Sequence, residues 1–305
     1  EKNNRELSKN LYEIIKHMPK KSHPMDVART AVSVMGLEDK ETQDSSPEAN
    51  MRKALRIFAK TPTALAAFYR IRKGQKIIKP KKNLTFAENF FYMCFGKVPQ
   101  KEIVKAFDVS LILYAEHSFN VSTFTARTIT SSLSDIHGAI TGAIASLKGP
   151  LHGGANEEVM HMMNKIKKPE NALKWINNAL KNKDVVMGFG HRVYKSGDSR
   201  VPTMRQYFGK VAKLKKDKKF EKIYDIVERV MIKEKNIHPN VDYPTGPTYH
   251  LMGFDTDFFT PIFVISRITG WSAHIMEQHA ANKLIRPLAS YKGSKHRKVI
   301  QLNQR

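Results

Sequence analysis

The chain has 305 residues, of which 41% are hydrophobic and 26% charged, and its formal net charge is +24 at pH 7. This length and composition predict an ordered protein with one large domain or two modest ones, and they exclude a disordered chain. The lysine excess is compatible with a polyanionic partner or with a solvated surface. The densest basic run, residues 213–219, has no interleaved aromatic residue, so we favour the solvated surface and expect no nucleic-acid partner.

Membrane and disulfide chemistry are not expected. The longest apolar stretch, Phe258–Ile265, is far too short to span a bilayer. Residues 1–5 are polar and no apolar segment follows them, so no signal peptide is expected here. Cys94 is the only cysteine, which excludes an internal disulfide and a Cys-based zinc site and fits a reducing compartment.

Helix-starting signals appear early in the chain. Ser46-Pro47 places an N-cap residue before a proline at the first helical position. Thr61-Pro62 repeats this pattern and predicts a second helix start, and Thr85-x-x-Glu88 is a capping box. No long alternating run predicts a strand, so the predicted fold class is all-α.

Three later segments also have helical patterns. Glu102–His117 is apolar nearly all round in its second half, which predicts burial on every side. Ser122–Ser146 is dominated by small residues, which predicts close helix packing within the chain or across a subunit boundary. Arg267–Ile285 predicts a long helix that ends at Arg286-Pro287.

A change in composition indicates the domain organisation. Residues 168–235 are more polar and richer in lysine than their flanks, which indicates a smaller, more exposed domain inserted into a larger one. We therefore expect a large helical domain at residues 1–153 and 248–305 and a small helical domain at residues 154–247.

The first segment with chemical potential surrounds His152. Glycines flank it on both sides, and they allow a backbone to approach a ligand closely. A helix is expected to begin just after it, and the positive end of a helix dipole favours a neutral imidazole. A neutral imidazole can donate a hydrogen bond to a carbonyl that is becoming an enolate. The alternative for an isolated histidine is a capping or core role.

The second segment is Gly188-Phe189-Gly190-His191. It lacks the third glycine and the preceding strand of a dinucleotide-binding fingerprint, so it predicts a tight turn that presents His191 to a ligand. Arg192 and Lys195 are suited to a phosphate and Arg200 to a carboxylate, although each is also compatible with a solvated charge.

The third segment ends at Asp242 in a turn-rich stretch, where an Asx-turn and a general base are both plausible interpretations. His117 follows the expected buried helix and is either a core histidine or a ligand contact. Glu157 and His161 lie four residues apart, but no third ligand is evident, so no metal site is predicted.

Together these segments resemble the citrate synthase family, through most of the chain. The resemblance rests on YAEHSFNVSTFTAR from Tyr114, GPLHGGANEE from Gly149, GFGHRVYKSGDSR from Gly188, NVDYPTG from Asn240 and FFTPIFVISRITGW from Phe258. It implies an all-α homodimer in which each subunit has a large domain and a small domain that closes over the substrates. It also implies acyl-CoA and oxaloacetate as substrates, with no tightly bound cofactor.

The resemblance assigns roles to residues that match the family motifs. Asp242 matches the base that removes the α-proton of the acyl-CoA, and His152 matches the donor to the thioester oxygen. His191 matches the residue that polarises and protonates the oxaloacetate carbonyl. The groups that match oxaloacetate-binding residues are His117, Arg200, Arg267 and Arg286, the last reaching in from the neighbouring subunit. Those that match the CoA-binding loop are Val185, Met187, Gly188, Gly190 and Arg192, with Lys195 at a phosphate-contacting position.

Elementary chemistry agrees with these roles. The α-proton of a thioester is far less acidic than a carboxylic acid, so an aspartate can remove it only if the enolate oxygen is stabilised in the same step. Oxaloacetate is a dianion, which accounts for several arginines and histidines around one pocket. Exclusion of water until the new bond forms requires a closing domain.

Within the family, Tyr114 and the runs from Gly197 and Gly246 resemble the 2-methylcitrate synthases, which use propionyl-CoA. Val241 is more similar to citrate synthases, which use acetyl-CoA. One methylene changes discrimination by only about 1–3 kcal/mol, so some use of both substrates is expected. The resemblance favours transfer of the propionyl group to give 2-methylcitrate, as in propionate catabolism, with the citrate synthase reaction of the tricarboxylic acid cycle as the alternative.

The sequence begins within what resembles an early helix of the family fold. We therefore expect the natural protein to extend further toward the N-terminus. The expected location is cytoplasmic, of the bacterial type, and a mitochondrial matrix location stays compatible with the sequence.

Overall fold

A computed structural model of the chain describes all residues except 150–151, 195 and 295–296. The described residues form thirteen α-helices and three short 3₁₀ helices with no strand, which confirms the all-α prediction. The α-helices are α1 (Lys9–His17), α2 (Pro24–Glu38), α3 (Pro47–Arg72), α4 (Phe86–Phe95), α5 (Lys101–Tyr114), α6 (Val121–Ser131), α7 (Ile136–Leu147), α8 (Ala155–Ile166), α9 (Pro169–Asn182), α10 (Val201–Leu214), α11 (Lys219–Lys235), α12 (Asp242–Met252) and α13 (Phe259–Ala280).

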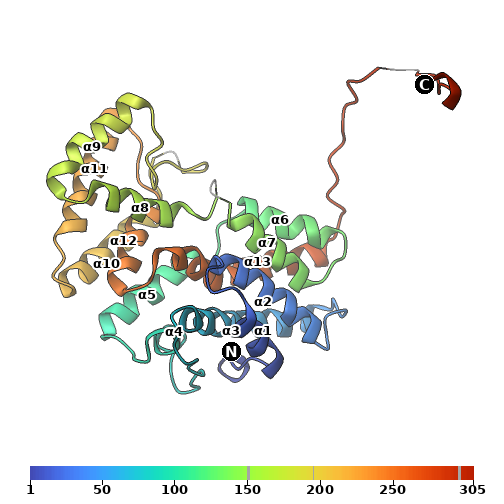
Figure 1. The fold of residues 1–305 in the computed structure, drawn as a ribbon, viewed down its shortest axis with the longest axis horizontal. Coiled ribbons are helices and arrows are strands. Elements are labelled where there is room, and N and C mark those ends of the chain that lie inside the picture. Colours follow the sequence, from blue (N-terminus) through green and yellow to red (C-terminus); the bar gives the residue numbers. More distant parts are fainter. Residues whose placement is uncertain (150–151, 195, 295–296) are drawn as a thin grey trace.

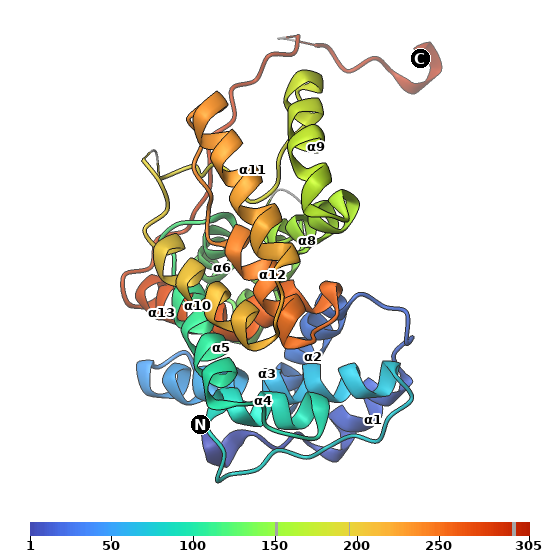
Figure 2. The ribbon, with the colours of Figure 1, turned by 90° about the vertical axis from the view of Figure 1, so that its left-hand side faces the viewer.

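The helices gather in two groups (Figure 1). Helices α1–α7 pack around α13, which contacts α3, α5, α6 and α7. Helices α8–α12 form a second lobe, in which α9 packs on α11 and both α8 and α10 pack on α12 (Figure 2). This lobe meets the larger body where α10 and α12 contact α5 and where α8 contacts α13. The predicted domain limits at residues 154 and 247 stay a prediction, although the lobe is built from this part of the chain.

The helix start predicted at Thr61-Pro62 is wrong, as helix α3 shows. Thr61-Pro62 lies inside one continuous 26-residue helix rather than at a helix start. A proline inside a helix costs about 3 kcal/mol. Residues 61–69 are all buried, and the Thr61 hydroxyl donates to the Ile57 carbonyl oxygen, so burial of this stretch offsets the cost.

The small-residue segment forms two helices, α6 and α7, that pack closely against each other. A Cβ atom placed on Gly142 would clash with the Cδ1 atom of Ile129. The predicted close packing is therefore present within this chain. It positions the N-terminus of α6 beside the turn that carries His152.

Two other helix predictions need correction. Ile112, in the second half of α5, is 64% exposed, so that helix is not buried on every side. Helix α13 begins at Phe259 and ends at Ala280, before the predicted end at Ile285. The chain turns there because Asn282 donates to the Ser131 carbonyl oxygen and the Ile285 N–H donates to the Ser131 hydroxyl, which ties it to the end of α6.

Two surface predictions can be examined directly. The lysines between α10 and α11 are exposed in this chain, as expected for a solvated surface. Within the described part of the chain, none of the helices combines the length and hydropathy needed to cross a membrane.

Candidate active site

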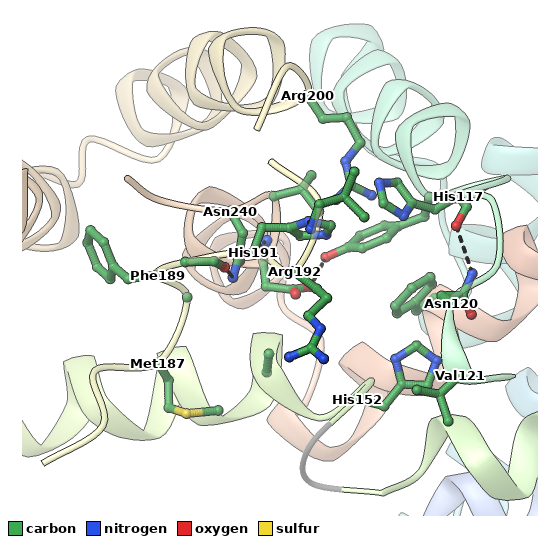
Figure 3. Close-up of a pocket in the computed structure, with 18 of the residues that line it drawn as sticks. His117, Asn120, Val121, His152, Met187, Phe189, His191, Arg192, Arg200 and Asn240 are labelled. Atoms are coloured by element: carbon green, nitrogen blue, oxygen red, sulfur yellow. Dashed lines mark hydrogen bonds between the residues drawn. The ribbon is translucent and has the colours of Figure 1, made fainter. Parts of the chain in front are cut away.

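A cavity of about 560 Å³ lies between the two groups of helices. It brings together predicted catalytic and oxaloacetate-binding residues from widely separated parts of the sequence, and Figure 3 shows His117, His152 and His191 arranged around it. The predicted residues that line it are His117, His152, Val185, Met187, Gly188, Gly190, His191, Arg192, Arg200, Asp242 and Arg267.

The two remaining predicted site residues are Lys195 and Arg286. Lys195 lies outside the described residues. Arg286 lies beyond the end of α13, is exposed, and does not line the cavity of its own chain. A contribution of Arg286 to a neighbouring subunit therefore stays a prediction.

His152 is held by the larger body. Its Nε2 atom accepts a hydrogen bond from the Ser122 N–H at 3.1 Å, so Nε2 carries no proton and the neutral ring carries its proton on Nδ1. The Ser122 hydroxyl oxygen accepts from the Trp271 indole N–H at 3.1 Å. Burial, with a contribution from Arg267, lowers the His152 pKa to about 4. At neutral pH this ring is therefore an uncharged hydrogen-bond donor through Nδ1.

His191 is presented by two chain segments that pair with each other. The Gly190 N–H donates to the His238 carbonyl oxygen, and the Asn240 N–H donates to the Gly188 carbonyl oxygen, each at 2.8 Å. Both glycines have positive φ values, 84° for Gly188 and 77° for Gly190, which explains why glycine occupies these positions. The pairing places the turn that carries His191 next to the start of α12.

The orientation of the His191 ring is also fixed. Its Nδ1 atom accepts hydrogen bonds from the N–H groups of Val193 and Tyr194, at 3.0 and 3.3 Å. The proton of the neutral ring therefore resides on Nε2. Both cavity histidines thus have one nitrogen fixed as an acceptor by backbone N–H groups, which leaves the other as a donor.

Asp242 is the first residue of α12 and the only carboxylate among the described residues that line the cavity. Its Oδ1 atom accepts a hydrogen bond from the Tyr114 hydroxyl at 2.5 Å. Burial raises the pKa of this carboxyl, whereas the Tyr114 hydrogen bond and the charge of Arg200 oppose the rise. A raised pKa makes the carboxylate a stronger base than an exposed aspartate.

Arg200 is oriented by Asp198, which was not predicted from the sequence. The buried Asp198 carboxylate accepts from Nε and Nη2 of Arg200, at 2.9 and 2.8 Å. It also accepts from the Val241 N–H at 2.9 Å, one residue before Asp242. Burial tends to raise the Asp198 pKa, but the hydrogen bonds and charge of Arg200 outweigh it, and the net pKa is lowered. One carboxylate therefore links the arginine to the turn that carries Asp242.

His117 and Arg267 line the same cavity and come from the larger body. Arg267 is 1% exposed, and its Nε donates to the Tyr114 carbonyl oxygen at 2.6 Å. Burial, together with Arg200, lowers the Arg267 pKa to about 10, so the guanidinium stays charged at neutral pH. Burial also lowers the His117 pKa, to about 4, with Arg200 adding to the effect. The cavity thus pairs two fixed positive charges with neutral histidines, which suits a dianionic ligand.

Apolar side chains surround the mouth of the cavity. Phe119 and Val121 come from the large body, and Val185 and Val193 come from the lobe. All four are between 60% and 82% exposed. Apolar surface on both sides of an opening is typical of a site that contacts a ligand larger than its polar centre.

The two residues considered as metal ligands, Glu157 and His161, have other surroundings in the structure. Glu157 instead accepts hydrogen bonds from the hydroxyl and the N–H of Thr260, and His161 is exposed on the surface of α8. No group of three or more potential ligands occurs among the described residues.

Sequence reasoning missed three residues that hold the site: Ser122, Asp198 and the side chain of Tyr114. Ser122 lies within a helical pattern, and Tyr114 was noted only for its resemblance to the 2-methylcitrate synthases, so neither side chain was assigned a hydrogen bond in the site. Asp198 had a usable signal, because an aspartate in a turn often accepts from the N–H two residues on, as Asp198 does from Arg200 at 3.0 Å.

Comparisons with known proteins agree with this geometry. The family described as "Citrate synthase, C-terminal domain" matches residues 1–288. A "2-methylcitrate synthase 2" of Corynebacterium glutamicum is 51% identical over 99% of this chain and 80% of its own length, and a "Citrate synthase" of Mycolicibacterium smegmatis is 50% identical over 98% and 80%.

A solved structure extends the likeness to three dimensions. The citrate synthase of Thermoplasma acidophilum, solved as a ternary complex with carboxymethyl coenzyme A and oxaloacetate, has a TM-score of 0.91. It is 32% identical, and the match covers all of this chain and 82% of that one. The sequence match, the shared all-α fold and the assembled cavity lead to one conclusion: this chain belongs to the citrate synthase family of enzymes.

Proposed function

We propose that this enzyme condenses propionyl-CoA with oxaloacetate and water to give 2-methylcitrate and CoA. The observation that carries the proposal is the convergence of Asp242, His152 and His191 on one cavity that also holds Arg200 and Arg267. The names of relatives support the reaction class, because both citrate synthase and 2-methylcitrate synthase occur among proteins about 50% identical to this chain.

Each residue has a role in this proposal. Asp242 removes an α-proton of the thioester while the Nδ1–H of His152 donates to the thioester oxygen. The resulting enolate attacks the ketone carbon of oxaloacetate, whose oxygen receives a proton from His191. Arg200, Arg267 and His117 bind the carboxylates of oxaloacetate. Hydrolysis of the condensed thioester then releases CoA and the product.

The binding of CoA is part of the same proposal. The segment from Val185 to Arg192 contacts the adenine, and Lys195 contacts a phosphate. Acyl-CoA acts as a substrate, and no tightly bound cofactor is required. The apolar residues at the cavity mouth, which include Phe119, are suited to the acyl and pantetheine parts of the ligand.

The working unit in this proposal is a homodimer in which Arg286 completes the neighbouring subunit's oxaloacetate site. Arg286 is exposed and does not line its own cavity, which is compatible with a role in trans. Closure of the lobe formed by α8–α12 over the larger body would exclude water during the condensation.

The preference for propionyl-CoA over acetyl-CoA rests on Tyr114 and on the runs from Gly197 and Gly246, whereas Val241 favours acetyl-CoA. The alternative is therefore a citrate synthase, or an enzyme that uses both substrates. A single methylene in an apolar pocket changes discrimination by about 1–3 kcal/mol.

Steady-state thiol release with oxaloacetate tests the proposal. A higher kcat/KM for propionyl-CoA than for acetyl-CoA is expected, and the reverse order would make the enzyme a citrate synthase. The variant Asp242→Asn is expected to lower kcat by about 10²–10⁴-fold, the usual contribution of a general base. Thiol release with neither substrate, from folded protein, would refute the proposed reaction.

A further inference from the structure

Tyr114 joins the two parts of the active site. Its hydroxyl donates to Oδ1 of Asp242 in the lobe at 2.5 Å, and its carbonyl oxygen accepts from Arg267 in the larger body at 2.6 Å. The side chain is 1% exposed, and its ring packs against Phe263 with ring centroids 4.2 Å apart. A side chain so enclosed has little freedom to move its hydroxyl.

The hydrogen bond makes the two oxygens of Asp242 unequal. Oδ1 is engaged by the phenol, and the Asp242 N–H is held by the Asn240 side chain at 3.1 Å. Both ends of the residue are therefore fixed. Oδ2 is the oxygen left to receive a proton from a substrate in the cavity.

We propose that Tyr114 is a positioning residue that makes Asp242 remove only one of the two α-hydrogens of a propionyl thioester. This inference rests on the proposed function. In the step, the Cα–H bond breaks and the proton goes to Oδ2. The electron pair becomes the carbon–carbon double bond of the enolate, whose oxygen accepts from His152.

The acyl chain determines whether such positioning matters. The three hydrogens of an acetyl methyl group exchange places by rotation, so any of them can meet the base. The two α-hydrogens of a bound propionyl group cannot exchange, because the terminal methyl group occupies one side of the carbon. A carboxylate held in one orientation reaches one hydrogen, whereas a carboxylate free to rotate reaches both.

The test uses propionyl-CoA with deuterium at either the pro-R or the pro-S α-position. The wild-type enzyme is expected to retain deuterium in the product from one substrate and lose it from the other. Tyr114→Phe keeps the ring and removes the donor, and is expected to reduce this selectivity by about tenfold, the effect of one hydrogen bond. Unchanged selectivity in Tyr114→Phe would overturn the inference.

A matched control separates positioning from general damage. Tyr249 is equally buried, and its hydroxyl shares a hydrogen bond with the Ser110 hydroxyl at 2.9 Å rather than with Asp242. Tyr249→Phe is expected to keep the wild-type selectivity. If Tyr114→Phe does not fold, Tyr114→His supplies a different ring donor, and its selectivity is expected to lie between that of the wild type and random removal.

A second readout does not depend on the acyl chain. The Tyr114 hydrogen bond lowers the pKa of Asp242, so its loss is expected to move the acidic limb of the kcat/KM profile to higher pH. This shift is expected with acetyl-CoA as well, and an unmoved limb would contradict the inference. Lack of propionyl-CoA turnover by the wild-type enzyme would instead refute the proposed substrate, and the profile with acetyl-CoA would still test Tyr114.

Discussion

The two sides of the cavity are built differently. On the larger body, His152 is tied through Ser122 to Trp271, a fully buried residue of α13. On the lobe, His191 and Asp242 depend on two paired turns, at residues 188–190 and 238–240, with Asp198 beneath them. His152 is therefore supported by the helical core, whereas His191 and Asp242 are supported by two loops that hydrogen-bond to each other.

The proposed chemical roles are divided between these two sides of the cavity. The group proposed to stabilise the enolate is part of the core, whereas the proposed base and the proposed acid for oxaloacetate belong to the lobe. The Tyr114–Asp242 hydrogen bond connects the two sides directly. In the proposed closure, a change in the position of the lobe would alter the distance between the base and the thioester.

The largest expected loss of stability on the lobe side of the cavity comes from removing the charge of Asp198. Asp198→Asn leaves the mostly buried Arg200 without its partner, and the expected loss in the free energy of unfolding is about 3–5 kcal/mol. Chemical denaturation measures this loss. The KM for oxaloacetate is expected to rise while the KM for acyl-CoA stays unchanged, because Arg200 is proposed to bind oxaloacetate alone.

The control is an aspartate–arginine pair in the same lobe at the surface. Asp225 pairs with Arg205 at 2.8 Å, and its side chain is 58% exposed. Asp225→Asn is expected to cost less than about 1 kcal/mol. Equal losses for the two variants would contradict the view that Asp198 organises the lobe side of the site.

A smaller perturbation acts on the paired turns. A Cβ atom on Gly188 would lie 2.6 Å from the Cγ2 atom of Val159 and 2.9 Å from the Cβ atom of Tyr243. Gly188→Ala is therefore expected to lower the free energy of unfolding by about 2–4 kcal/mol, from crowding and from its positive φ. Gly253→Ala shares the positive φ but has open space, so it should lose only about 1–2 kcal/mol. A similar loss in both variants, measured by denaturation, would show that crowding is unimportant.

The last prediction concerns the effect of acid on His152, on the side of the larger body. His152 has a pKa of about 4 in the folded protein, against 6.5 as its ordinary value. Between pH 6.5 and 4 the unfolded chain binds the extra proton and the folded chain does not, so acid lowers the free energy of unfolding in this window. The variant His152→Gln is expected to reduce this dependence by at most about 1.4 kcal/mol per pH unit, measured by urea denaturation at several pH values. An unchanged slope would place the acid sensitivity elsewhere.

Local patterns supported the all-α class, and the residues that line the cavity were assigned from local patterns together with the resemblance to the family motifs. Gly188 and Gly190 are an example, since their turn needs positive φ values that glycine adopts readily. The capping box at Thr85 and Glu88 is another, because both of its hydrogen bonds are formed between residues three positions apart. By contrast, Pro62 followed a local rule for helix starts and still lies within α3, where burial outweighs the local preference.

What the sequence alone determined, then, is the set of chemical groups and the short turns that carry them, because such turns depend on neighbouring residues. The tertiary structure decided which groups touch. Tyr114 and Asp242 are separated by 128 positions, and Ser122 and Trp271 by 149, and no local pattern specifies either contact. Only the packing of α5 against α12 and of α6 against α13 brings these pairs within hydrogen-bonding distance.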